Sequence, residues 1–276
     1  MLDLHFTTGG RSWRADVRAP VDLAIPLYFQ GPQPRVFAEQ PAFAEPLRAG
    51  RFTGSIAAGA SCNCSVQTFA PHCHGTHTEC VGHVTLNATV LAGLTPVPPA
   101  VALLVTVRPE PRRAAATGDH SPCDPDEPVV SRDMLASAVA RWIRDPWTAL
   151  VVRTLPNDPG KLGRRYDGPC PAPYFTPDAM HWVVERGVTS LVVDLPSLDR
   201  AEDGGRLAAH RIFWGLPDGA TDARQARRGQ ALVTELAYVP DHAPDGLYLL
   251  DLHVPAFATD AAPSRPVLYP LAEAAR

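Results

Sequence analysis

The chain has 276 residues, of which 45% are hydrophobic and 20% are charged, and its formal net charge is −4. These values are typical of a globular protein with a sizeable core and argue against a disordered chain. The 25 basic and 29 acidic residues are interspersed, without the basic stripe that is typical of nucleic-acid binding. We therefore expect no nucleic-acid partner.

The first sixteen residues contain no charged segment followed by an apolar one, so we expect no signal peptide. No run approaches the 18 or so apolar residues of a membrane span. A chain of this size does not need disulfides to be stable, and we expect a cytoplasmic protein with reduced thiols. Its six cysteines are Cys62, Cys64, Cys73, Cys80, Cys123 and Cys170.

The predicted elements begin with an apolar, β-branched run at 101–107, which is typical of a buried strand. A helix is predicted over 131–144, with Ser131 as N-cap, and a strand over 148–154. A second helix is predicted over 176–186, because Thr176 can cap it and Pro177 suits its first turn. Three further strands follow, at 188–194, 231–239 and 246–254.

This alternation of strands and helices predicts an α/β fold with added β structure. We expect a single domain over 1–276. Two segments, at about 108–128 and 199–230, are polar and irregular. Long segments of this kind are often functional, so each is interpreted as a surface loop or an active-site lid.

Side chains that bind metals are concentrated in one short segment. Four of the ten histidines lie within twelve positions, together with Glu79 and two cysteines. Thiolate, imidazole and carboxylate are the ligands that zinc prefers. His77 and Glu79 are two positions apart, so on an extended strand they would share one face, and Gly75-Thr76 before them favours a tight loop instead of a helix. The alternative is a polar loop whose histidines are incidental.

This segment resembles the signature of the cyclase family, which includes kynurenine formamidases and isatin hydrolases. The signature reads His-x-Gly-Thr-His-x-Asp-x-Pro-x-His. On residues 73–83 of this chain, the matching residues are Gly75, Thr76, His77 and His83, and the departures are Cys73 for His, Glu79 for Asp and Val81 for Pro.

Further landmarks of the family occur in the expected order. They are Val21-Asp22-Leu23, Arg153-Thr154, Tyr174-Phe175-Thr176, the run from Asp194 to Asp199, Glu235-Leu236 and Pro263-Ser264-Arg265. The resemblance covers roughly residues 20–268. It implies a swivelling β/β/α architecture, with a mixed sheet flanked by helices.

The resemblance also implies a set of metal ligands. Cys73, His77 and Glu79 would bind one ion, while His210 and Glu235 would bind a second ion to which Glu79 also bridges. Zn²⁺ is the implied cofactor, at one or two ions per chain, with Mn²⁺ less expected. His83 would act as the catalytic acid and base, since imidazole titrates near neutral pH.

The departures leave several alternatives open at these positions. Cys73 could be a metal ligand, a structural thiol or a nucleophile. A shift in register would let His72 or His74 supply the missing imidazole instead. Glu79 is one carbon longer than aspartate, so the bridge between two ions could be lost.

The implied function is metal-dependent hydrolysis of a C–N amide bond in a small cyclic or aromatic substrate, as in a formamidase. Alternatives on the same scaffold are lactone hydrolysis and a cyclase or dehydratase reaction in natural-product biosynthesis. A non-catalytic ligand-binding protein is a further alternative. By analogy with relatives, we expect a homodimer or homotetramer.

Overall fold

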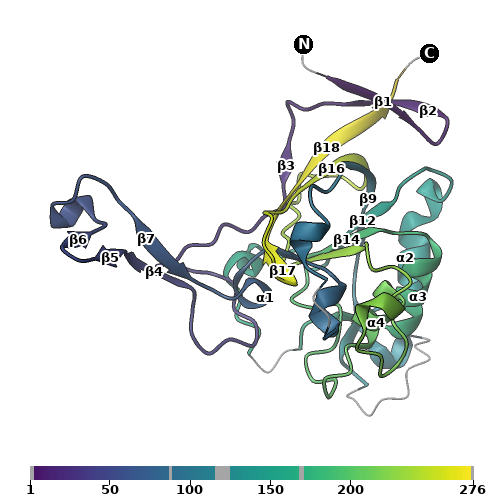
Figure 1. Cartoon of the computed structure of the whole chain (residues 1–276). Coiled ribbons are helices and arrows are strands. Elements are labelled where there is room, and N and C mark those ends of the chain that lie inside the picture. Colours follow the sequence, from purple (N-terminus) through teal and green to yellow (C-terminus); the bar gives the residue numbers. More distant parts are fainter. Residues whose placement is uncertain (1–2, 87–88, 116–124, 168–170, 275–276) are drawn as a thin grey trace.

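An eleven-stranded mixed sheet runs through the molecule (Figure 1). The computed structural model describes residues 3–86, 89–115, 125–167 and 171–274. The strands follow one another across the sheet in the order β1 (Leu4–Thr8), β2 (Arg11–Ala15), β18 (Arg265–Glu273), β16 (Gly246–His253), β9 (Ala100–Val107), β12 (Ala149–Thr154), β14 (Ser190–Val193), β15 (Leu232–Glu235), β8 (His77–Glu79) and β17 (Ala261–Pro263), and β3 (Val21–Asp22) pairs with β18.

The middle of this sheet is parallel, and its flanks are antiparallel. β9, β12, β14 and β15 run in the same direction, while β16 pairs antiparallel with β9, and β8 with β15. Parallel strands need crossover connections, and helices α2 (Arg132–Val139) and α3 (Pro177–Glu185) provide two of them. The predicted α/β fold with a mixed sheet is therefore confirmed.

Helices α2, α3 and α4 (Ala208–Trp214) lie on one side of the sheet (Figure 1). Thr176 caps α3 as predicted, because its hydroxyl accepts a hydrogen bond from the Ala179 amide at 3.2 Å. Ser131 occupies the N-cap position of α2, but its hydroxyl donates to Glu110 instead. The helix predicted over 131–144 is shorter, since α2 ends at Val139 and continues as the 3₁₀ turn Ala140–Trp142.

The central strands are buried on both faces, and their side chains alternate between two apolar layers. Leu103, Leu150 and Leu191 point toward the helices. Leu104 and Val151 point to the opposite face, where they join residues of β3 and β16. This burial explains why the strands read as continuous apolar runs in the sequence.

Smaller elements lie outside the main sheet. A three-stranded sheet contains β10 (Glu110–Pro111), β11 (Pro128–Val130) and β13 (Tyr174–Phe175). The short helix α1 (Pro71–His74) precedes β8. The 3₁₀ turns are Ile56–Ala58, Val81–Val84, Leu91–Gly93, Arg112–Ala114, Ala140–Trp142, Pro159–Gly163 and Ala223–Gln225.

A β arm extends away from the body of the molecule (Figure 1). It is formed by β4 (Phe43–Pro46) with β7 (Ser65–Thr68), and β5 (Arg48–Ala49) with β6 (Phe52–Thr53). Cys62 and Cys64 are exposed in this arm as free thiols. Cys73 and Cys80 are free thiols as well, while Cys123 and Cys170 lie outside the described residues.

The two segments interpreted as loops or lids contain regular structure. The first includes β10 and a 3₁₀ turn, and its residues 116–124 lie outside the described part of the chain. The second forms α4. Among the described residues, no helix is long and apolar enough to cross a membrane.

Candidate metal centre

Strand β8 presents two potential ligands from the interior of the sheet. It lies between β15 and β17, and pairs antiparallel with both. Because successive side chains alternate, His77 and Glu79 share one face, as predicted, while Thr78 turns to the other. There the Thr78 hydroxyl lies 2.7 Å from that of Thr234. His77 and Glu79 are completely buried.

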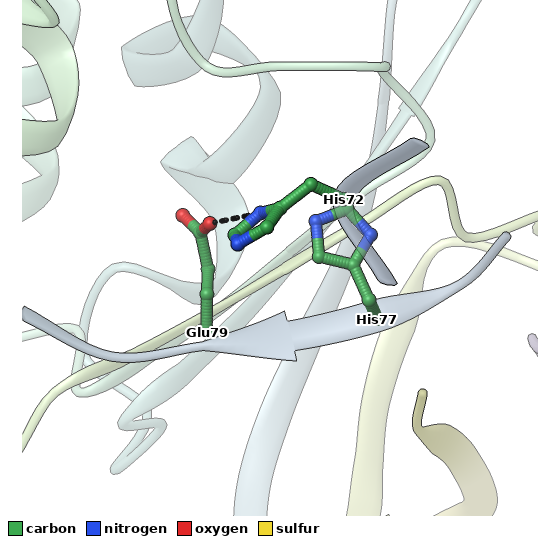
Figure 2. A group of neighbouring side chains, drawn as sticks. All are labelled: His72, His77 and Glu79. Atoms are coloured by element: carbon green, nitrogen blue, oxygen red, sulfur yellow. Dashed lines mark ion pairs between the residues drawn. The ribbon is translucent and has the colours of Figure 1, made fainter. Parts of the chain in front are cut away.

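Helix α1 adds His72 to this face. His72 Nδ1 lies 3.0 Å from Glu79 Oε2, and Figure 2 shows the ring beside the carboxylate and close to His77. The tight loop predicted before His77 is thus preceded by a helical turn. This turn places His72, rather than the next residue, against β8.

Among the described residues, several groups of side chains lie close enough together to hold a metal ion, and Cys73 and His74 belong to none of them. Consecutive helical residues point about 100° apart, so only one of the three adjacent side chains can face β8. Burial raises the pKa of the Cys73 thiol, and its carbonyl accepts the Val36 amide. His74 accepts from the Ala70 amide through Nδ1, and its Nε2 lies 3.0 Å from the Gln40 carbonyl. His72 thus takes the position of the metal ligand that the family resemblance implied for Cys73.

His210 enters the centre from α4. It is 1% exposed, and its Nε2 lies 2.7 Å from Glu79 Oε1. Asp199 holds this helix, since its carboxylate accepts hydrogen bonds from the amides of Ala209 and His210 and lies 2.5 Å from His210 Nδ1. The polar segment at 199–230 therefore carries a buried residue of the site.

Glu235 completes the buried cluster from β15. Its position pairs with His77 across the sheet, and its Oε2 lies 3.6 Å from His77 Nε2. Its Oε1 lies 3.3 Å from His210 Nε2 and accepts the Leu198 amide at 2.7 Å. The structure therefore brings Glu235 and His210 together with the residues of β8.

His83 lies at the edge of this cluster, in the 3₁₀ turn Val81–Val84. Its side chain is 25% exposed, and its Nδ1 lies 3.9 Å from Glu79 Oε2. The rings of His83 and His210 are 5.5 Å apart at their centroids. A small molecule could reach His83 from solvent, in contrast to the fully buried ligands behind it.

Acidic and basic side chains inside the cluster shift each other's pKa values. Burial would raise the pKa of Glu79, but the positive charges of His210 and His83 lower it well below its usual value. Burial would lower the pKa of His210, but the charge of Glu79 and contacts with Asp199 and Glu235 raise it well above its usual value. Without a metal, these shifts favour a protonated His210 beside an ionised Glu79.

Four buried side-chain atoms of this cluster make no hydrogen bond of acceptable geometry with any of the described residues. They are His77 Nε2, Glu79 Oε1, Glu79 Oε2 and His210 Nε2. Buried polar atoms normally have partners, because leaving them unpaired is costly. Ligands around a tetrahedral zinc ion lie about 3.3 Å apart for bonds of about 2.0–2.1 Å. His210 Nε2 and Glu235 Oε1 have this spacing. The donor set and its unpaired atoms therefore fit a divalent cation.

The histidines of the cluster are oriented by groups behind them. His77 Nδ1 lies 3.0 Å from the Gly75 carbonyl, which leaves Nε2 directed at the cluster. His210 is held in the same way by Asp199. Metal-binding histidines usually have such a second partner. The sequence placed Asp199 at the end of the landmark run that begins at Asp194 but predicted no role for it, because its contact with His210 depends on how α4 packs.

A family model described as "putative cyclase" matches residues 20–200. A comparison with curated proteins finds no match. Several solved structures share the fold. Isatin hydrolase A from Labrenzia aggregata has a TM-score of 0.58 at 16% identity, over 91% of this chain and 93% of that one. A structure described as a predicted metal-dependent hydrolase from Bacillus stearothermophilus has a TM-score of 0.55 at 16% identity, over 91% and 98%.

A further structure, described as a novel cyclase, has a TM-score of 0.59 at 14% identity, over 92% of this chain and 89% of that one. These TM-scores show a shared fold, although the sequence identities are only 14–16%. The family model covers more than half of the chain. This chain therefore belongs to the cyclase family.

Proposed function

We propose that this chain is a metal-dependent hydrolase that cleaves a C–N amide bond in a small cyclic or aromatic substrate. The observation that carries the proposal is that Glu79 is shared by two groups of potential metal ligands, one with His72 and His77 and one with His83 and His210, and that both of its oxygens are buried without a hydrogen bond of acceptable geometry among the described residues. The neighbouring folds described as an isatin hydrolase and a metal-dependent hydrolase are consistent with it.

The ligands proposed for the metal are nitrogen and oxygen atoms. His72 and His77 would hold one ion, His210 and Glu235 a second, and Glu79 would contact both, since its two oxygens face different histidines. This arrangement would preserve the bridge that the longer side chain of Glu79 had put in question. Imidazole and carboxylate suit Zn²⁺, which we propose as the cofactor.

The chemistry that such ions supply is Lewis acidity, which polarises a substrate carbonyl and lowers the pKa of water. The protein residues would contribute the proton transfer. His83 is partly exposed and is not among the proposed metal ligands, and its Nδ1 faces the carboxylates of Glu79 and Asp260. Its Nε2 is therefore the atom that we assign to protonating the leaving nitrogen.

Metal analysis and a substrate panel test this proposal. Protein purified without chelators should contain up to two zinc ions per chain, and removing them should abolish turnover of aryl formamides or cyclic amides. Turnover of lactones alone would change the substrate class without changing the site. Protein that binds neither zinc nor manganese would contradict the proposal and leave a ligand-binding role.

A further inference from the structure

Asp260 approaches the metal centre from a part of the chain that the family signature does not include. It directly precedes β17, whose first residue, Ala261, pairs with Glu79 across the sheet. The Asp260 carbonyl accepts the Cys80 amide at 3.0 Å, so the main chain is fixed at this point. The Asp260 side chain is 42% exposed and lies at the entrance to the cluster.

One oxygen of Asp260 faces two histidines. Asp260 Oδ2 lies 2.9 Å from His72 Nε2 and 3.4 Å from His83 Nδ1. The two rings lie almost face to face, with centroids 4.3 Å apart and an angle of 31° between their planes. The Asp260 carboxylate thus contacts both His72, the proposed metal ligand, and His83, the histidine assigned to proton transfer.

The contact with His72 resembles that between Asp199 and His210. In each pair one ring nitrogen faces an aspartate, while the other faces Glu79. A carboxylate behind a metal-binding histidine fixes the ring orientation and the nitrogen that carries the proton. With Nε2–H donated to Asp260, the Nδ1 lone pair of His72 is free for a metal beside Glu79.

We propose that Asp260 is a positioning residue that orients His72 as a metal ligand and His83 as the acid and base. The inference rests on the proposed function. It also accounts for the use of His72, since this ligand lies in a short helical turn and is 27% exposed, unlike the buried His77 and His210. A ring held at one edge only would rotate, and Asp260 supplies the second contact.

The test compares Asp260→Ala with Asp260→Glu and with the control Asp251→Asn. Asp251 also contacts a histidine, His253, at the exposed end of β16 and outside the groups of potential metal ligands. Zinc affinity is measured by chelator competition, and kcat and KM at saturating zinc. Loss of a carboxylate behind a ligand lowers metal affinity or activity about 10- to 100-fold.

For Asp260→Ala we expect that loss of affinity, together with a kcat that stays low at saturating zinc while KM changes little. Asp260→Glu should recover part of both, and Asp251→Asn should match the wild type. Wild-type zinc affinity and kcat in Asp260→Ala would overturn the inference.

A crystal structure of each metal-free protein separates this inference from the proposed function. In wild-type protein the rings of His72 and His83 should each adopt one orientation, and in Asp260→Ala they should adopt several. If the wild type binds no metal, the proposed function fails, and the ring orientations still decide whether Asp260 positions these histidines. Identical, single orientations in both proteins would overturn the inference.

Discussion

Glu79 Oε1 and His210 Nε2 lie 2.7 Å apart, although one residue belongs to the short strand β8 near one edge of the sheet and the other to a helix more than a hundred residues later. The contact joins the signature segment to the polar segment at 199–230. It also means that the ligands proposed for the second ion, His210, Glu235 and Glu79, come together only when α4 packs against the sheet.

The identity of the ligand in α1 can be tested by two single substitutions. His72→Gln should lose zinc affinity by at least about tenfold, because it removes an imidazole that contacts Glu79. Cys73→Ser should keep zinc and turnover near wild-type values, since Cys73 lies outside the ligand groups. Isothermal titration with zinc measures both variants. The reverse pattern would restore Cys73 as the ligand.

Replacing His83 should separate catalysis from metal binding. His83→Ala is expected to lower kcat by about 10²- to 10⁴-fold, the usual contribution of a general acid or base. Its zinc content should stay unchanged, because His83 is not among the residues proposed to hold the ions. His253→Ala, at an exposed strand position, serves as the matched control. Unchanged turnover in His83→Ala would remove its assigned role.

The stability of the metal-free protein should depend on His72 at alkaline pH. Burial lowers the pKa of His72, but the carboxylates of Asp260 and Glu79 outweigh burial and raise it to about 10. A raised pKa contributes stability that is fully present below the unfolded value, about 6.5, and is lost as pH rises through the folded one. Thermal unfolding across this range should therefore show a falling Tm.

The variant His72→Gln lacks this titration, so its Tm should fall less over the same pH range. The Tm of the zinc-loaded protein should also fall less, since a metal-bound imidazole is already deprotonated. An equal fall in all three proteins would assign the pH dependence to other groups.

A buried ion pair next to the sheet should be important for stability. Lys161 Nζ lies 2.6 Å from Asp194 Oδ2, and both side chains are at most 5% exposed. Burial raises the pKa of Asp194, while Lys161 opposes this rise. Lys161→Met leaves a buried carboxylate without its partner and should lower the free energy of unfolding by about 3–5 kcal/mol.

Denaturant unfolding measures this change. The double variant Lys161→Met/Asp194→Asn should lose less, because it removes the unpaired charge and keeps an acceptor for Thr154. Equal losses in the single and double variants would show that the charge of Asp194 is not the cause.

The β arm provides a prediction about assembly. A two-stranded hairpin is marginally stable on its own in water, and the arm residues Phe43 and Val66 are 45% and 43% exposed. We expect the arm to contact a second copy of the chain in a homodimer or homotetramer. Light scattering should show dissociation of the double variant Phe43→Ser/Val66→Ser at concentrations where the wild type is associated.

Phe257→Ser is the control for this experiment, since Phe257 is equally exposed but lies outside the arm. Dissociation by Phe257→Ser alone, or a wild type that is monomeric at all concentrations tested, would contradict the assignment of the arm.

The central fold was predictable because its signals are local. Strands such as 101–107 are continuous apolar runs, and Thr176 with Pro177 marks the start of a helix. The prediction that His77 and Glu79 share one face of the strand followed from the two-residue period of a strand. Contacts made by Asp199 and Asp260 were not predictable, because each depends on segments that meet only in the folded chain.

The exchange of Cys73 for His72 has a local cause that the signature could not reveal. A signature counts positions, whereas the ligand is chosen by the direction in which a helical turn presents its side chains. Pro71 at the start of α1 favours that turn, and the turn selects the first of three adjacent residues. The sequence left this register shift open as one of several alternatives.

Strand β8 also makes the site sensitive to insertions and deletions. Its alternation places two ligands on one face and Thr78 on the other, where Thr78 contacts Thr234 and Ser264. A shift of the strand register by one residue would turn the Thr78 hydroxyl toward the ions. It would also turn the side chains of His77 and Glu79 toward the hydroxyls of Thr234 and Ser264. Single substitutions can therefore adjust this centre gradually, but a change of one residue in length would replace it altogether.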